Sequence, residues 1–407
     1  MKVCLVSKEY PPETAHGGIG TQTWNKARAL AALGHDVHVV SSLATNALEP
    51  TLTREADGVT VDRIPTPSAE GAVYSQAVYD TAYSWNVLKH LEPSLERGAF
   101  DLIDFAEYGA EGYAYQLNRT PWNWAAVVVQ LHGPLAMFAE RIGWPEPESD
   151  FARVVSFMEG LSIRHADALM ACSANIADFA SEREGVPREE IDVVHCGVDA
   201  SAFQPRGRDA GLEPRVLFVG NVAPNKGLET AFRAVQRLRG RYPRLRLRVL
   251  GRGDATFLAS LRAEDPDAIE YGGFVSDRGE VAAEYAKAEV FCSPAFHEVG
   301  VANVYLEAMA CGCPVVAGAT GGAPEAVTDG VEGFLVAPGD ADAAARAIGR
   351  VLEEPGLRTA LAKAARRRVE SYFAIEPYMD RVLGVYERAL AVSERQLAER
   401  KVALDVS

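Results

Sequence analysis

The sequence predicts an α/β protein made of two Rossmann-like βαβ domains that face each other across a cleft. Three observations support this fold class. Short apolar runs of strand length alternate with segments of helical periodicity, which is typical of parallel sheets covered on both faces. A polar stretch interrupts the alternation near mid-chain, after which it starts again. The length of 407 residues exceeds what one hydrophobic core usually holds, so two domains are expected.

The first half begins with a buried strand at Met1–Ser7. The glycine-rich run Gly17–Gly18–Ile19–Gly20 then opens a helix that ends at Gly34, a residue typical of helix C-termini. Helical patterns separate most of the later strands, notably over Val73–Leu91 and Phe151–His165. These later strands are predicted at Asp36–Val40, Val59–Ile64, Phe100–Phe105, Ala125–His132, Ala168–Ser173 and Ile191–Cys196.

The second half begins after a polar segment with Pro and Gly, Ala200–Pro214, which is the predicted linker. From about Ala341 onward the chain is almost wholly helical, and its last helix is predicted over Pro377–Glu399. We therefore predict domains over residues 1–204 and 205–373, followed by a C-terminal helix over 374–407. The strands of the second domain are predicted at Arg215–Val219, Leu245–Leu250, Ile269–Tyr271, Val290–Ser293, Pro314–Ala317 and Phe334–Val336.

Composition excludes several classes of partner. The net charge of -15 and the sequence pI near 5.1 argue against nucleic acid or an anionic membrane surface as the main partner. The first residues lack the apolar run of a signal peptide, and no stretch is apolar enough to span a membrane. The six cysteines lie mostly in apolar runs. Reduced, buried thiols in a cytoplasmic protein explain them best.

The segment Phe296–Val327 carries the strongest candidate site. It places Glu298 and Glu307 at the two ends of a glycine-bearing loop that enters a helix. The start of a helix presents free N–H groups and a positive dipole, which together suit a phosphate. Because a carboxylate one turn into the helix would repel a phosphate, its expected partner is a hydroxyl, such as that of a ribose. An ordinary capped helix with two solvated glutamates explains the same residues.

Three other strand ends carry candidate residues. Gly18 lies in a loop without the third glycine and the acidic residue of a dinucleotide site, so a nicotinamide enzyme is disfavoured. His132 ends a strand, where it could donate to a sugar hydroxyl, although a lone histidine is more often structural. Lys226 follows another strand at a helix start and is a natural phosphate ligand or a solvated surface lysine. Glycine turns at residues 251–254 and 272–275 line the same half.

These features together resemble the retaining glycosyltransferases of the GT-B fold, specifically the family 4 or group 1 type. The matching stretches span nearly the whole chain, and the most specific is EVGVANVYLEAMACGCPVVAGATGGAPEAV, which begins at Glu298. The resemblance implies transfer of a sugar from a nucleoside diphosphate donor with retained configuration and without a metal or other cofactor. It also implies a donor-binding C-terminal domain, an acceptor-binding N-terminal domain and a last helix that crosses back to the first domain.

Carried over by position, the resemblance also implies roles for single residues. Lys226 and the backbone of Val301, Ala302 and Asn303 would bind the diphosphate, and Glu307 would hold the ribose hydroxyls. The remaining roles are as follows: Glu298 on the donor sugar, Gly18 at the leaving phosphate, His132 beside the reacting sugar, Asn221 at the start of the diphosphate motif, and Arg252 and Val275 near the base.

Two departures from the family pattern bear on these roles. Asn221 stands where the family usually has an arginine. Eight residues separate Glu298 from Glu307, whereas the family usually has seven, so a one-residue bulge is needed to keep Glu298 in place.

The predicted function is therefore retaining transfer to a small-molecule or saccharide acceptor by front-face displacement. Two alternatives stay open, a sugar-nucleotide 2-epimerase on the same fold and a non-catalytic nucleotide-sugar-binding protein. We expect no nucleic acid and no integral membrane contact as partners. Both a monomer and a homodimer fit the sequence, and the donor base, the sugar and the acceptor are left open.

Overall fold

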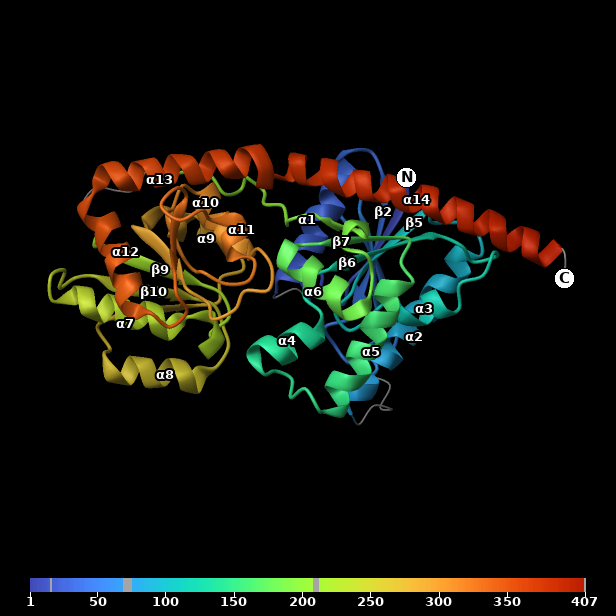
Figure 1. Cartoon of the computed structure of the whole chain (residues 1–407), viewed down its shortest axis with the longest axis horizontal. Helices are drawn as coiled ribbons and strands as arrows, with labels where there is room; N and C mark the ends of the chain where they lie inside the picture. The colour runs from blue at the N-terminus through green and yellow to red at the C-terminus, as the bar shows by residue number, and fades with distance from the viewer. Residues whose placement is uncertain (15–16, 69–74, 208–211, 406–407) are drawn as a thin grey trace. The chain divides into compact units, whose positions relative to one another are not determined.

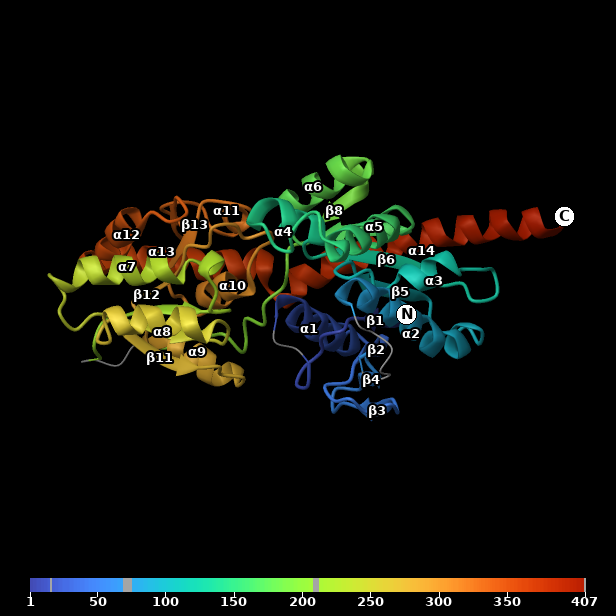
Figure 2. The ribbon, with the colours of Figure 1, turned by 90° about the horizontal axis from the view of Figure 1, so that it is seen from below.

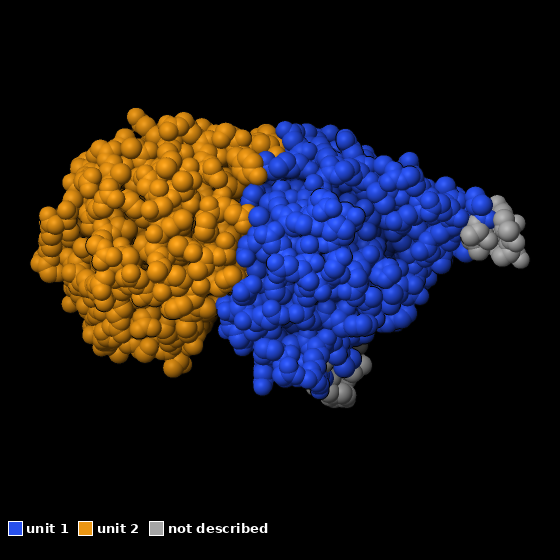
Figure 3. Space-filling model, viewed as in Figure 1, with its two compact units in different colours: residues 1–195, 378–407 blue, residues 196–377 orange. Residues whose placement is uncertain are grey.

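The computed structural model of the chain (Figure 1) describes residues 1–14, 17–68, 75–207 and 212–405. These residues form two compact units, coloured separately in Figure 3. Unit 1 comprises Met1–His195 and Tyr378–Ser407, and unit 2 comprises Cys196–Pro377. Each unit is a largely parallel sheet with helices packed on it, which confirms the predicted α/β class.

The sheet of unit 1 contains eight strands among the described residues, in the order β3-β4-β2-β1-β5-β6-β7-β8. Seven of them coincide with the predicted strands. The prediction missed β3, an exposed edge strand that pairs antiparallel with β4, whereas the other seven strands pair in parallel as expected. The bounds are β1 Lys2–Val6, β2 Asp36–Ser42, β3 Thr51–Arg54, β4 Thr60–Ile64, β5 Leu102–Ala106, β6 Ala126–Leu131, β7 Ala168–Ala171 and β8 Ile191–Val193.

The strand order of unit 1 changes direction between β1 and β5. The chain first adds strands on one side of β1, and β5 then pairs with its other side in parallel. Every residue of β5 and β6 is buried, as expected for central strands covered on both faces. In open parallel sheets such a switch point is where ligands bind, beyond the carboxyl ends of the strands.

The helices of unit 1 cover both faces of its sheet. The predicted helix over Val73–Leu91 corresponds to α2, and its first two residues, Val73 and Tyr74, lie outside the described residues. The bounds are α1 Gly18–Ala32, α2 Gln76–Leu95, α3 Tyr113–Leu117, α4 Leu135–Ile142, α5 Asp150–Arg164, α6 Ala174–Glu184 and the 3-10 turn Arg188–Glu190.

The last helix, α14 (Ile375–Asp405), begins in unit 2, and its residues from Tyr378 onward belong to unit 1. Figures 1 and 2 show it in red along the strands of unit 1. The Tyr386 hydroxyl donates to Asp104 of β5 at 2.5 Å, and Asp104 also forms a buried ion pair with Lys26 of α1. Because three elements meet at one buried carboxylate, this helix is part of the fold of unit 1.

The sheet of unit 2 contains six parallel strands among the described residues, in the order β11-β10-β9-β12-β13-β14. All six coincide with predicted strands. The order changes direction between β9 and β12, so the switch point of this unit lies between those two strands. The bounds are β9 Arg215–Val219, β10 Arg246–Leu250, β11 Ile269–Gly273, β12 Val290–Ser293, β13 Val315–Gly318 and β14 Gly333–Val336.

The helices of unit 2 pack on its two sides. In Figure 1, α9, α10 and α13 lie on one side, and α7 and α8 lie on the other. Helix α7 packs against α12, and α10 packs against α9 and α13. The bounds are α7 Leu228–Arg239, α8 Ala255–Glu264, α9 Arg278–Lys287, α10 Asn303–Ala310, α11 Ala323–Ala326, α12 Ala341–Glu353 and α13 Pro355–Arg368, with short turns at Pro224–Lys226 and Val369–Phe373.

The first part of the predicted linker is held within unit 2. The Arg366 guanidinium donates to the backbone oxygens of Ala200 and Phe203 at 3.1 and 2.8 Å, and the Phe203 ring is buried. Residues 208–211 of the same segment lie outside the described residues. No helix of the described part of the chain is both long and apolar enough to cross a membrane.

Candidate functional site

Most of the predicted donor residues of unit 2 follow the carboxyl ends of β9 and β12, and the loop after β13 packs against them. Backbone contacts tie the three following loops together: Phe296 N donates to Asn225 O at 2.9 Å, and Gly322 N donates to Glu298 O at 2.7 Å. The Ser293 hydroxyl also donates to Lys226 O at 3.2 Å. The loops on both sides of the switch point therefore form one connected surface.

Lys226 and Glu298 meet across this switch point. Lys226 ends a short 3-10 turn after β9, and its Nζ lies 2.9 and 3.2 Å from the two carboxylate oxygens of Glu298. The two side chains are 31% and 14% exposed, so both can be reached by a ligand. The sequence predicted each residue singly, and the structure shows that they form an ion pair.

The loop of Glu298 packs against the following Gly-Gly turn. Gly321 has a φ of +59°, and a Cβ at that position would lie 1.8 Å from Glu298 O. Val299 and Val301 are buried beneath the loop. In this loop the Glu298 carboxylate faces Lys226.

Helix α10 begins beside this pair. Ala302 is its N-cap and Asn303 its first residue, which places Val301, Ala302 and Asn303 at the helix start as predicted. The first N–H groups of a helix point away from it and carry a positive partial charge, so this end attracts an anion. No acidic side chain lies in the first turn to neutralise it.

Glu307 lies one turn into α10, among aromatic side chains. Its carboxylate accepts a hydrogen bond from the Tyr285 hydroxyl at 3.2 Å. Burial raises the pKa of Glu307 to about 7, although the charge of Arg278 and the Tyr285 hydrogen bond oppose this rise. A carboxylate with this pKa can accept hydrogen bonds from hydroxyl groups near neutral pH.

The remaining donor candidates lie on more exposed loops of unit 2. Asn221 and Arg252 are exposed, and Val275 is half-buried. The Arg252 guanidinium lies 4.2 Å from the centre of the Phe274 ring, so this arginine is turned toward an aromatic face. Arg252 also lines a cavity of about 280 Å³ with Val222 and Tyr271.

The two predicted residues of unit 1 lie at the start of α1 and after the end of β6. Gly18 is the exposed first residue of α1, and His132 directly follows β6. Burial, with a smaller contribution from the charge of Lys26, lowers the pKa of His132 to about 3. The imidazole is therefore neutral near pH 7 and suited to hydrogen bonding rather than to acid catalysis.

The sequence reasoning missed the carboxylates that follow β5. Glu107 and Glu111 are buried, and each has a pKa raised by burial to about 7. Glu107 accepts hydrogen bonds from the backbone of His132 and Gly133, and Glu111 accepts from Lys8 N at 2.9 Å. The available signal was an acidic residue directly after the mostly apolar strand Leu102–Ala106, where burial of a carboxylate is costly unless it has hydrogen-bond partners.

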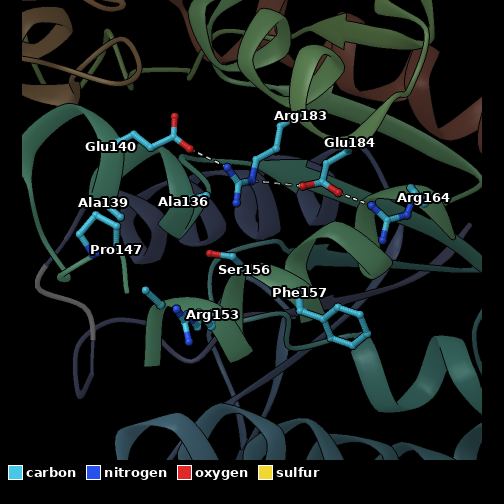
Figure 4. A pocket seen from close by; sticks show the side chains of 11 residues that line it. Ala136, Ala139, Glu140, Pro147, Arg153, Ser156, Phe157, Arg164, Arg183 and Glu184 are labelled. Carbon is cyan, nitrogen blue, oxygen red and sulfur yellow. Dashed lines mark hydrogen bonds and ion pairs between the residues drawn. The ribbon is translucent and has the colours of Figure 1, made fainter. Parts of the chain in front are cut away.

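A cavity of about 560 Å³ also lies in unit 1, between α4, α5 and α6 (Figure 4). None of the predicted site residues lines it. Its edge is a chain of ion pairs in which Arg183 contacts Glu140 and Glu184, and Glu184 contacts Arg164. Because each of these arginines already faces a carboxylate, this part of the wall offers little net charge to an anionic ligand.

Two family models match the chain in sequence. The model of a glycosyl transferase 4-like domain matches residues 17–197, and the model of glycosyl transferases group 1 matches residues 213–354. Their boundary falls near the division between the two units.

Similar proteins agree with these matches. A D-inositol 3-phosphate glycosyltransferase of Mycobacterium marinum is 31% identical over 396 residues, covering 92% of this chain and 82% of the relative. A glycogen synthase of Mycobacterium tuberculosis is 28% identical over 398 residues, covering 92% and 91%.

Solved structures show the same two-domain fold. A sucrose-phosphate synthase from Thermosynechococcus elongatus superposes with a TM-score of 0.81 at 23% identity, covering 96% of this chain and 99% of the other. Anabaena HepE in complex with UDP and glucose superposes with a TM-score of 0.72 at 19% identity, covering 95% and 99%.

Proposed function

The chain belongs to the group 1 glycosyltransferases, and we propose that it transfers a sugar from a nucleoside diphosphate sugar to an acceptor hydroxyl with retention of configuration. The observation that carries this proposal is the Lys226–Glu298 pair at the switch point of unit 2, beside the start of α10. A cation, a helix N-terminus and two carboxylates match the charges and hydroxyls of such a donor.

In the proposed complex, the diphosphate lies at the start of α10 with Lys226 on its oxygens. Glu298 then exchanges part of its contact with Lys226 for a hydroxyl of the donor sugar, and Glu307 accepts from the ribose. Donors aimed at a departing phosphate stabilise the transition state by about 2.7–4 kcal/mol each. Lys226 and the N–H groups of α10 supply this stabilisation without a metal ion.

The proposed chemistry is a front-face displacement. The bond between the anomeric carbon and the diphosphate oxygen breaks, and its electron pair leaves with the diphosphate. The acceptor oxygen bonds to the same face of that carbon, and its proton passes to the departing phosphate oxygen. The neutral imidazole of His132 hydrogen-bonds the reacting sugar. Supporting this route, Glu298 contacts Lys226 through both oxygens, which makes it a charge partner and a poor nucleophile.

The names of relatives support a proposal for the acceptor class. The names of two relatives mention glycogen and D-inositol 3-phosphate, which both carry hydroxyl groups. We therefore propose a saccharide or a small polyol as acceptor. The six cysteines are all buried and free, which fits the proposed action in the cytoplasm.

The first test is a melting-temperature screen against UDP-, GDP-, ADP- and dTDP-glucose. A donor at 100 times its Kd should stabilise the protein by about 2.7 kcal/mol through mass action. Lys226→Ala should abolish most of this shift and lower turnover about 100- to 1000-fold. Lys287→Ala is the matched control, because Lys287 is also a partly exposed lysine of unit 2 that pairs with a glutamate, Glu284.

Product analysis then separates the proposal from its alternatives. Nuclear magnetic resonance of the product should show the donor's anomeric configuration on the acceptor. An epimerised sugar formed without any acceptor would instead identify an epimerase. Donor binding without any release of nucleoside diphosphate would indicate a binding protein, and a trapped glycosyl-carboxylate would overturn the front-face route.

A further inference from the structure

Two buried glutamates of unit 1 hold the backbone of the loop that carries His132. Glu107 accepts from His132 N at 2.7 Å through Oε2 and from Gly133 N through Oε1. Glu159 of α5 accepts from Leu135 N at 2.8 Å through Oε2 and from Gly109 N at 3.0 Å through Oε1. Both residues are almost completely buried, with 0% and 1% exposure.

These contacts favour the ionised carboxylates and so oppose the rise in pKa that burial causes. Each glutamate faces two N–H donors, and only a carboxylate presents an acceptor on both oxygens. An amide would point a donor at one of the N–H groups, and a protonated carboxyl would accept more weakly through its hydroxyl oxygen. Leu135 is the first residue of α4, so its N–H has no partner within the helix, and Glu159 supplies one.

The position of Glu107 is itself fixed by a tightly constrained loop. Glu107 directly follows β5, a strand of the switch point, and its own N–H donates to Gln130 O of β6 at 3.1 Å. Ala110 has a φ of +52°, a conformation that costs a non-glycine residue free energy. At Gly109 a Cβ would lie 2.3 Å from Lys8 Nζ. Such a loop allows its carboxylate little freedom to move.

Burying two neighbouring carboxylates costs free energy that other side chains at these positions would not cost. Burial raises the pKa of Glu159 well above its ordinary value, and the neighbouring charge of Glu107 raises it further. Neutral side chains could fill the same space, or water could satisfy the N–H groups of a solvent-facing loop. The arrangement gains instead a rigid turn from His132 to Leu135.

We propose that Glu107 and Glu159 are positioning residues that clamp the turn His132–Leu135 from two sides and thereby hold the His132 imidazole at the reacting sugar. This proposal rests on the proposed function, because it needs His132 to contact the donor sugar. Neither glutamate itself is expected to contact the substrate.

The test compares Glu107→Gln, Glu107→Asp and Glu159→Gln with a matched control, Asp167→Asn. Asp167 is also a buried carboxylate that accepts a backbone N–H of β6, but at the opposite end of the strand, where it contacts Val127 N at 2.7 Å and Arg119. The first readout is amide hydrogen exchange, which needs no activity. Both Gln variants should exchange the amides of residues 132–135 about tenfold faster, and Asp167→Asn should leave them unchanged.

The second readout is steady-state release of nucleoside diphosphate from the nucleotide sugar that most stabilises the wild-type protein. Glu107→Gln should lower kcat about 10- to 100-fold with donor KM changed less than about threefold, because a small misplacement of a catalytic group mainly affects the chemical step. Glu107→Asp, which keeps the carboxylate, should recover much of this loss.

The possible failures are distinguishable. A wild-type protein that releases no nucleotide from any donor contradicts the proposed function. An active wild type whose Glu107→Gln and Glu159→Gln variants match Asp167→Asn in exchange at residues 132–135 and in kcat overturns the clamp. If Glu107→Gln does not fold, Glu159→Gln decides, because it disrupts one of the two backbone contacts of Glu159, to Leu135 or to Gly109, and leaves Glu107 in place.

Discussion

At the scale of single residues, the chemistry of the candidate site depends on charged side chains that are partly buried. Lys226 and Glu298 neutralise each other across the switch point. Burial raises the pKa of Glu307, and Arg278 and Tyr285 oppose this rise, so that the pKa is about 7. In the proposed complex, the diphosphate of the donor would replace Glu298 as a partner of Lys226, and the ribose would donate hydrogen bonds to Glu307.

The pKa of Glu307 makes donor binding sensitive to pH. Only the ionised carboxylate accepts hydrogen bonds on both oxygens, so the affinity for the nucleotide sugar should fall as pH drops below about 7. The loss should approach about tenfold per pH unit. Calorimetric titration at pH 8, 7 and 6 measures it, and the diphosphate diester of the donor does not titrate in this range.

Two variants isolate this effect. Glu307→Gln should bind the donor weakly and show little pH dependence. Glu111→Gln is the control, because Glu111 also has a pKa near 7 but lies in unit 1, and it should keep the wild-type dependence. An unchanged pH dependence in Glu307→Gln would exclude the ribose contact.

The pH dependence of folding stability has the opposite sign to that of donor binding. Because the pKa of the Glu307 carboxyl is raised in the folded state, the folded state binds protons more tightly than the unfolded state. The contribution of Glu307 to stability therefore grows as pH falls from about 7 toward 4.5.

At the scale of elements, the loops after the strands are shaped by close backbone contacts. The Gly-Gly turn after β13 lies against the loop of Glu298, and Gly322 N donates to Glu298 O. A side chain cannot enter this contact, because the space at Gly321 is filled by that oxygen. The backbone of Glu298 is therefore held by the neighbouring turn.

Gly321→Ala should consequently displace Glu298 and weaken donor binding. We expect a loss of about 3 kcal/mol in the free energy of unfolding, from the clash and the positive φ together, and more than about tenfold weaker donor binding. Gly330→Ala is the matched control: Gly330 has a φ of +75°, and a Cβ there meets nothing within 4 Å. It should lose only about 1 kcal/mol and bind donor normally. Equal effects of the two substitutions would contradict the packing argument.

At the scale of the whole molecule, the chain returns to its first unit through α14. The contacts of this helix are polar as well as apolar. Trp124 Nε1 donates to the Ser393 hydroxyl at 2.8 Å, and Tyr386 donates to Asp104. Residues nearly three hundred positions apart in sequence are thus joined by direct hydrogen bonds. The stability of unit 1 should depend on this helix.

Tyr386→Phe should lower the free energy of unfolding of unit 1 by about 1.5–3 kcal/mol, because it removes a hydrogen bond to a buried charge. All five tryptophans of the sequence belong to unit 1, so their fluorescence during urea denaturation reports on that unit. Tyr83→Phe is the control, since the Tyr83 hydroxyl is buried without a hydrogen-bond partner among the described residues. If both substitutions have the same effect, α14 does not stabilise unit 1 through Tyr386.

The sequence alone determined the elements and their chemical character. Apolar runs such as Val290–Ser293 and Arg215–Val219 have few alternatives to a buried parallel strand, so local pattern placed them well. It missed β3, whose residues are exposed and carry no apolar pattern. The helix start at Asn303 was readable as well, because a glycine-bearing loop precedes an apolar face.

Only the tertiary structure decided which of these residues meet. Lys226 and Glu298 are 72 positions apart, and they pair because β9 and β12 are neighbours in the sheet. Glu107 contacts the loop of His132 because β5 and β6 are adjacent, and nothing in its local sequence shows this. The local sequence determines the hydrophobic periodicity of each element and the free energy of burying each side chain. The order of the strands in the sheet determines which of the loops that follow them lie together in one site. For this protein, function rests on that order.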